Sequence, residues 1–200
     1  MLSRRPANSN AGFSLVELLV VISLVGILFA SFGVFFSGYL KLYSSYQTDA
    51  TNFSELAQQS QRISKVLRGI VDITSVGSND MTAYAYFSPG DTYTSVVRYY
   101  LNASNNQLMV DVTPMTANPP IGTPITASKR TYTIISNYYK KPTVNLFDYY
   151  DSTGTLLTPP VANQHTIATI NVNLYVPASR SSNGQQMSTS VSLRNRKVNL

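Results

Sequence analysis

An unbroken apolar stretch near the start of the chain constrains its fold more than any other feature of the sequence. Residues 13–40 read FSLVELLVVISLVGILFASFGVFFSGYL, in which every residue except Glu17 is apolar or small. This run is longer than the ~20 residues that a helix needs to cross the hydrocarbon core of a bilayer. We therefore expect a membrane-spanning helix at the start of the protein.

Basic residues on the two sides of this stretch predict its orientation. Arg4 and Arg5 precede the stretch, and Lys41 follows it closely. Because positively charged residues favour the cytoplasmic side of a membrane, this slight excess places the N-terminus in the cytoplasm. The prediction is a single-pass protein of the cytoplasmic membrane, with the bulk of the chain outside.

Two ordinary explanations of the apolar stretch leave part of it unexplained. A secretory signal peptide has a shorter apolar region, and the sequence LFA at 28–30 is a poor substitute for a signal cleavage site. A plain membrane anchor accounts for the length and the orientation but not for Glu17. A carboxylate inside the hydrocarbon costs about 2.5 to 3.5 kcal/mol on insertion scales, so Glu17 needs a partner.

The junction before the apolar run resembles the processing site of type IV prepilins. Residues 12–17 read GFSLVE, and in that family a dedicated peptidase cuts after the glycine. The resemblance implies cleavage between Gly12 and Phe13, N-methylation of Phe13, and pairing of the Glu17 carboxylate with the N-terminal amine of a neighbouring subunit. Such a pair penalises misplaced subunits, because a missing partner leaves a charge unsatisfied in apolar surroundings.

The apolar run departs from many major pilins in one respect. Those proteins have a proline where the helix can melt during assembly, whereas this chain has Val34 near that place. Gly26, Gly33 and Gly38 either provide the local helix flexibility that the proline gives in those proteins, or simply allow helices to pack closely.

Beyond the membrane segment the helical pattern continues. Apolar residues recur at spacings of three, four or seven, and they are Leu42, Tyr46, Phe53, Leu56, Ile63, Leu67 and Ile70. Gly69 and Gly77 indicate where the pattern ends. A helix from Phe13 to about Arg68 would be roughly 80 Å long, and the apolar stripe of its outer half would need a cover.

The remaining sequence predicts strands that would form this cover. Apolar and polar residues alternate in 168–176 and in 187–193, as in strands with one buried face. Residues 93–101 and 107–112 flank a five-residue loop and predict a hairpin. A further strand is expected at 82–87, and the prolines of 113–128 predict an irregular connection.

These patterns predict an α+β fold, in which a long N-terminal helix packs on an antiparallel sheet, as in pilins. We expect a leader at 1–12, a membrane or filament-core half of the helix at 13–40 and an amphipathic outer half at 41–70. A β-rich head outside the membrane would occupy 71–200. The segments VNLFDYYDSTG at 144–154 and STSVSLRN at 188–195 resemble minor pilins of the PilW and GspJ kind.

The side chains that would serve catalysis or metal binding are few. The chain has no cysteine, which excludes disulfides and thiolate sites, and its one histidine, His165, has no nucleophile motif near it. Asp148 and Asp151 offer oxygen ligands for calcium, but their spacing matches no known calcium loop. A turn at 151–154 explains them better, so we expect neither an enzyme nor a bound cofactor.

Positive charge is concentrated near the C-terminus. The net charge is +6, and removal of residues 1–12 leaves 13 basic and 9 acidic residues, or +4. Arg180, Arg194, Arg196 and Lys197, together with the fourteen tyrosines of the chain, are candidates for contact with DNA. A solvated edge strand protected by charge is the favoured explanation, because no nucleic-acid motif accompanies the basic residues.

The function that the resemblance implies is that of a structural minor pilin or pseudopilin. Its expected partners are other pilin subunits, prepilin peptidase and, before assembly, the membrane. The alternative is a membrane-anchored adhesin or DNA-uptake module, in which the apolar segment is only a tether.

Overall fold

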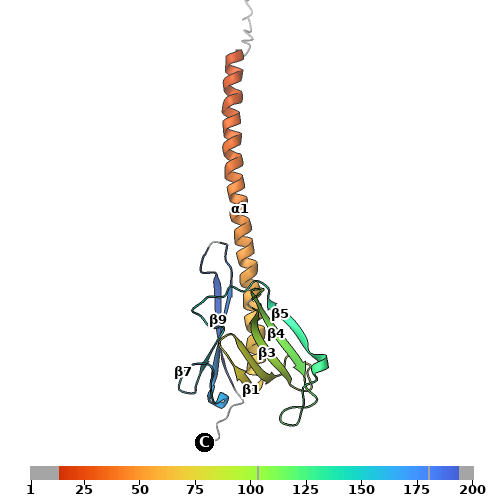
Figure 1. Ribbon diagram of the computed structural model, residues 1–200. Helices are drawn as coiled ribbons and strands as arrows, with labels where there is room; N and C mark the ends of the chain where they lie inside the picture. Colours follow the sequence, from red (N-terminus) through yellow and green to blue (C-terminus); the bar gives the residue numbers. More distant parts are fainter. Residues whose placement is uncertain (1–13, 103, 180, 194–200) are drawn as a thin grey trace, which may run out of the picture. The chain divides into compact units, whose positions relative to one another are not determined.

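The computed structural model describes residues 14–102, 104–179 and 181–193 (Figure 1). The chain divides into two compact units, Met1–Tyr46 and Gln47–Leu200. The described part of the first unit is almost entirely helix. The second unit, which we call the head, contains the last part of that helix and all of the strands.

The helix α1 spans Leu15–Arg68. No proline interrupts this range, and the helix stops where Gly69 turns the chain, with the Gly69 N–H donating to the Val66 carbonyl at 3.0 Å. Lys65 and Arg68 lie in the last turn, where cations are favoured by the helix dipole. The predicted end of the helix near Arg68 is confirmed. Ile70, which the helical pattern had included, begins a strand instead.

The nine strands among the described residues form two antiparallel sheets. Sheet 1 has the order β1-β2-β3-β4-β5, and sheet 2 has the order β7-β6-β8-β9. The strands of sheet 1 are β1 (Ile70–Val76), β2 (Asp80–Ala85), β3 (Ser95–Asn102), β4 (Gln107–Pro114) and β5 (Arg130–Ile135). Those of sheet 2 are β6 (Phe147–Tyr150), β7 (Leu156–Leu157), β8 (Thr169–Val176) and β9 (Gln185–Ser192), and two short 3-10 helices occur at η1 (Thr126–Ser128) and η2 (Gln164–Thr166). The α+β class is confirmed, with two sheets in place of one.

The predicted hairpin is the β3–β4 pair. Asn102 lies opposite Gln107, so the loop has four residues rather than five, and Asn106 takes a positive φ of 50° at its end. The strands predicted at 82–87, 168–176 and 187–193 correspond to β2, β8 and β9. The connection predicted at 113–128 is irregular after Pro114, apart from an isolated bridge between Met115 and Pro124 and the short η1.

Four strands are not predicted from the sequence, because none of them shows a clear alternation of apolar and polar residues. β1 follows α1 directly, and its first residue continues the helical spacing. β5 shows four exposed residues before its two buried ones, so it lacks alternation. β6 and β7 have only four and two residues, which is too short for a periodicity to be recognised.

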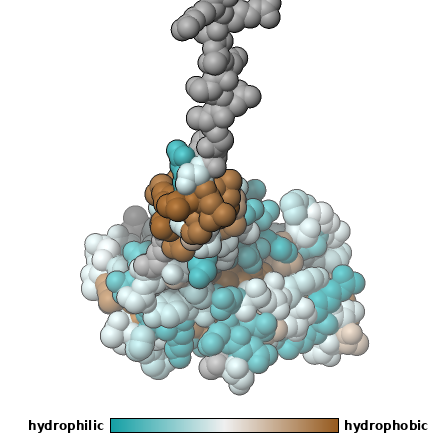
Figure 2. Space-filling view, turned by 90° about the horizontal axis from the view of Figure 1, so that it is seen from above, coloured by the Kyte–Doolittle hydropathy of each residue, from teal (hydrophilic) through white to brown (hydrophobic). Residues whose placement is uncertain are grey.

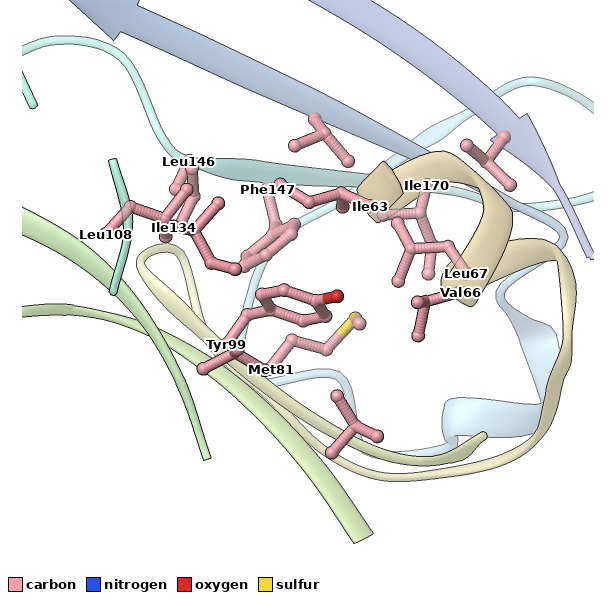
Figure 3. Packing of buried hydrophobic residues seen from close by; sticks show 14 of the residues in the cluster. Ile63, Val66, Leu67, Met81, Tyr99, Leu108, Ile134, Leu146, Phe147 and Ile170 are labelled. Atoms are coloured by element: carbon pink, nitrogen blue, oxygen red, sulfur yellow. The ribbon is translucent and has the colours of Figure 1, made fainter. Parts of the chain in front are cut away.

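One hydrophobic core joins α1 to both sheets inside the head. Figure 3 shows Ile63, Val66 and Leu67 of α1 beside Tyr99 and Met81 of sheet 1, with Phe147 and Ile170 of sheet 2 completing the cluster. Along the apolar stripe, Phe53 is still 47% exposed, and Leu56 is the first large residue that is buried. The cover expected for the outer half of the helix is therefore present only from Leu56 onward.

Strand β8 is buried on both faces over its second half. Asn173 and Tyr175, which the alternation had assigned to the solvent face, are each only 5% exposed. The segment before β6 covers them, since the Tyr138 hydroxyl donates to the Asn173 carbonyl at 2.9 Å. The Asn173 amide in turn donates to Asp148 at 2.8 Å. The buried polar groups of Asn173 are thus satisfied within the protein, as burial requires.

Candidate functional site

The first unit presents an apolar surface with no cover in the described chain. Its large hydrophobic side chains are 41–77% exposed, from Leu42 at the low end to Leu15 at the high end. In Figure 2 the visible part of α1 is mainly brown, whereas the visible surface of the head is mainly white and teal. A contiguous apolar surface of this kind marks a membrane or protein contact.

By length and composition, α1 meets the requirement for crossing a membrane. It is the one such helix in the described part of the chain, and the apolar window that qualifies it is not buried at all. A helix in the core of a soluble protein would be mostly buried, so the exposed surface distinguishes α1 from that case. The helix and its composition fit a membrane-anchored protein.

Glu17 is the acidic residue in the first turn of this helix. The turn is closed by the N–H of Leu18, which donates to the Ser14 carbonyl at 3.1 Å. The side chain of Glu17 is exposed and has no ion-pair partner among the described residues. The positive end of the helix dipole favours a carboxylate at this position, yet neighbouring Leu15, Val16 and Leu18 make its surroundings apolar.

Small residues form a stripe along one face of the same helix. Ser23, Gly26, Ala30, Gly33 and Ser37 follow one another at spacings of three and four, which places them on one side of α1. The Ser23 hydroxyl donates to the Leu19 carbonyl at 2.8 Å and the Ser37 hydroxyl to the Val34 carbonyl at 2.9 Å. We call these five residues the small-residue stripe.

The stripe leaves room for another backbone to approach. A Cβ atom added at Gly26 or Gly33 would meet nothing within 4 Å, so neither glycine is required by packing within this chain. Close approach of helices in a membrane or a fibre depends on such residues. The sequence predicts a packing role for the glycines but not for Ser23, Ala30 and Ser37, although the spacing of three and four links all five residues.

Most of the predicted site residues lie outside the described residues. These are Gly12 and Phe13 at the expected cleavage junction, and Arg180, Arg194, Arg196 and Lys197 in the C-terminal basic group. Glu17 is thus the predicted site residue whose surroundings are defined.

The turn predicted after β6 is confirmed. One carboxylate oxygen of Asp151 accepts hydrogen bonds from the backbone N–H groups of Thr153 and Thr155 at 2.9 and 2.8 Å, and Gly154 has a φ of +85°. The Thr153 hydroxyl donates to the same oxygen at 2.7 Å, and this bond, followed by that from Thr155, lowers the pKa of Asp151. The carboxylate is therefore occupied by its own turn, which joins β6 to β7.

His165 lies on the surface in η2. Its backbone N–H donates to the side chain of Asn163 at 3.0 Å, which caps this short helix. Groups of three or more metal-ligating side chains are absent from the residues that the structure describes.

The comparison with known families points to the N-terminus. A family model described as the prokaryotic N-terminal methylation motif matches residues 7–32. This range contains the junction of Gly12 and Phe13, the acid Glu17 and most of the small-residue stripe. The match supports a type IV pilin-like protein with a prepilin leader, and it suggests assembly with other pilin subunits. No curated protein matches the chain.

Proposed function

We propose that this protein is a minor pilin or pseudopilin that prepilin peptidase cleaves after Gly12. The processed chain is a non-enzymatic structural subunit of a type IV pilus or of a type II secretion-like pseudopilus. The observation that carries the proposal is the coincidence of the methylation-motif match with an exposed apolar helix that has a single carboxylate in its first turn.

The apolar surface of the first unit must be covered both before and after assembly. Burial of one Val, Leu, Ile or Phe side chain is worth about 1.5 to 3 kcal/mol relative to exposure, so α1 is not stable in water with this surface uncovered. A single-pass position in the cytoplasmic membrane covers it before assembly. Apolar helices of neighbouring subunits replace the lipid when the protein enters a filament.

Glu17 then fixes the position of each subunit relative to its neighbour in the filament. Cleavage after Gly12 creates a new amine at Phe13, four residues before the acid, which is about 6 Å along a helix. In the assembled filament the carboxylate pairs with the amine of a neighbouring subunit. Removal of one partner from a buried pair costs about 3 to 5 kcal/mol, because the other charge stays buried and uncompensated. Misplaced subunits are disfavoured by that amount.

The small-residue stripe supports the same assembly. Its glycines have no packing neighbours in the described chain, and its serine hydroxyls are bonded to the backbone of their own helix. This face of the helix therefore has small side chains, and its hydroxyl groups are already hydrogen-bonded. It suits close contact with the helix of an adjacent subunit, where van der Waals packing drives association.

The minor character of the subunit rests on resemblance. The segment 144–154 forms β6 with its Asp151 turn, and the described part of 188–195 forms the end of β9. Both segments resemble minor pilins of the PilW and GspJ kind, which help to prime assembly near the filament tip. Because the tip subunit of such complexes usually lacks the acid, a subunit that has Glu17 would lie below another.

Processing is the test that separates this function from that of a tethered adhesin or DNA-uptake module. The full chain is co-expressed with a prepilin peptidase, and intact mass is measured. We expect the wild-type protein to lose residues 1–12 and Gly12→Ala to be cut poorly or not at all. Gly26→Ala is the control, because a methyl group is accommodated there, and it should be cut like the wild type. An uncut wild-type chain would refute the proposal.

A further inference from the structure

A groove of about 1020 Å³ runs along the head beside the end of α1. Its walls come from the last turns of α1, the segment between β2 and β3, the end of β4 and the start of β5. The side chains that matter for its chemistry are Arg62, Lys65, Tyr86, Phe87, Tyr93, Arg130 and Tyr132. All of them belong to the head.

The groove exists because one corner of sheet 1 is uncovered. Arg130 lies opposite Val112, and Tyr132 lies opposite Val110, in the β4–β5 pair. Residues directly opposite one another project from the same face of a sheet, so Arg130 and Tyr132 share a face with the buried Val110. They are nevertheless exposed, whereas Ile134 and Ile135 at the other end of β5 are buried.

Aromatic rings line this corner. The rings of Phe87 and Tyr132 are stacked, with centroids 5.6 Å apart and planes 18° apart. The Arg62 guanidinium lies over the Phe87 ring, 5.0 Å from its centroid. The Tyr86 hydroxyl is held by the amide of Asn118 at 3.2 Å. The rings of Phe87, Tyr132 and Tyr86 are therefore held in place by contacts within the head.

Three of these rings remain open to solvent. Tyr86, Tyr93 and Tyr132 are 39%, 45% and 37% exposed. Aromatic side chains usually bury most of their area in cores and interfaces. Their exposure in one groove leaves flat surfaces on which another ring can stack.

The charge of the groove is positive. Arg62, Lys65 and Arg130 line it, and none of them forms an ion pair among the described residues. The one carboxylate in the lining is that of Asp91, which already accepts hydrogen bonds from the backbone N–H groups of Phe87 and Ser88 at 3.2 and 2.8 Å. Three cations therefore face a single carboxylate that is occupied by its own turn.

We propose that this groove binds single-stranded nucleic acid without sequence preference. Phosphates would face Arg62, Lys65 and Arg130, and bases would stack on the exposed tyrosines, which is the combination that single-strand binding surfaces use. An acidic peptide would satisfy the cations but leave the rings open, and a duplex does not present the faces of its bases. The basic residues near the C-terminus are not needed for this site.

Binding is measured with the full-length protein in a neutral detergent by fluorescence anisotropy of a labelled 20-mer of thymidylate. We expect binding at 50 mM NaCl that weakens with salt. With three phosphate contacts, the slope of log K against log salt should be about −2. A 20-mer of abasic sites and a poly-glutamate peptide are the comparison ligands, and both should bind at least about fivefold more weakly, because each stacked base contributes a factor of about that size or more.

Two comparisons between variants and their controls test whether binding occurs in this groove. Arg130→Gln should weaken binding and reduce the magnitude of the salt slope by about 0.7. Arg98→Gln is its matched control, because it makes the same charge change on the same sheet, where Arg98 pairs with Asp80 at 3.5 Å and lies on the opposite face. Tyr93→Leu should reduce the preference for the thymidylate over the abasic 20-mer by about fivefold or more, because one of the three exposed rings is lost.

Several outcomes would overturn the proposal. Equal losses in Arg130→Gln and Arg98→Gln would show that overall charge, not this groove, attracts the nucleic acid. Poly-glutamate that binds as tightly as the thymidylate would assign the groove to an acidic peptide. Absence of binding by the wild type at 50 mM NaCl would also refute it. Near-UV circular dichroism of each variant verifies that the head is folded.

Discussion

The hydroxyl of Tyr149 donates a hydrogen bond to the carbonyl of Gly77 at 2.9 Å, and this bond connects the two sheets of the head. Tyr149 lies in β6 of sheet 2, and Gly77 follows β1 of sheet 1. The backbone N–H of Phe147 donates to the Ser78 carbonyl at 3.1 Å beside it. The turn after β1 is therefore fixed by polar contacts from the other sheet as well as by the core.

Tyr149 and Tyr99 are both fully buried side chains, yet removal of their hydroxyls should have different effects on stability. Tyr149→Phe leaves the Gly77 carbonyl without this bond and should cost about 0.5 to 1.5 kcal/mol. The Tyr99 hydroxyl is buried with no hydrogen-bond partner among the described residues, so Tyr99→Phe should be neutral or stabilising. Thermal unfolding of the detergent-solubilised protein, followed by near-UV circular dichroism, measures both. Equal destabilisation by the two variants would contradict this assignment.

Alkaline pH should destabilise the head. Burial raises the pKa of Tyr99, Tyr138 and Tyr149 above the ordinary value of 10.0. A raised pKa means that folding favours the protonated hydroxyl, so its contribution is complete below pH 10 and is lost as the pH rises further. The unfolding temperature should fall steeply above about pH 10. Tyr99→Phe should make that fall shallower, and a wild-type midpoint that is constant to pH 11.5 would rule the effect out.

The pair of Asp111 and Lys129 should make stability depend on acid pH. Burial by itself raises the pKa of Asp111, but hydrogen bonds from Lys129 and Thr131 outweigh it and leave the pKa below its usual value of 3.8. The contribution of this lowered pKa is present above pH 3.8 and is lost as the pH falls below it.

Because Lys129 is half exposed, the effect should be under about 1 kcal/mol. Unfolding temperatures between pH 2.5 and 6 should show less pH dependence in Asp111→Asn than in the wild type. Asp80→Asn is the control, since the 3.5 Å pair of Asp80 and Arg98 is exposed on both sides. An equal change in both variants would show that the Lys129 and Thr131 contacts have no special role.

Substitution of Glu17 should separate membrane insertion from assembly. Glu17→Ala removes a carboxylate from an apolar helix, so insertion should be unimpaired or improved. Incorporation into filaments should fall, because the amine of the neighbouring subunit loses its partner. Membrane fractionation and the amount of the subunit in sheared filaments measure the two steps. Normal incorporation of the variant would remove the pairing role.

The small-residue stripe predicts a difference between two glycines of α1. Gly33→Leu fills the stripe and should reduce incorporation into filaments. Gly38→Leu is the matched control, because it lies about 140° away around the helix at about 100° per residue. A Cβ atom at either position meets nothing within 4 Å in this chain, so neither variant should alter the head. Equal defects would show that bulk anywhere on the helix disturbs assembly.

The sequence by itself determined the helices and strands that have a periodic pattern within a short stretch of chain. α1 followed from an apolar run continued by helical spacing without proline, and β8, β9 and the β3–β4 hairpin followed from alternation and a turn. Glu17 stood out because a charge within such a run is costly. Each of these signals is contained in a short stretch of chain.

Only the tertiary structure decided how these pieces combine. The division into two sheets, the cover over Asn173 and the groove all depend on contacts between distant residues. The groove brings together Arg62 of α1, Phe87 of a connecting segment and Tyr132 of an edge strand, and no local periodicity links them. Side-chain spacing predicts which face of an element is apolar, but the partner of that face is chosen by packing of the whole chain.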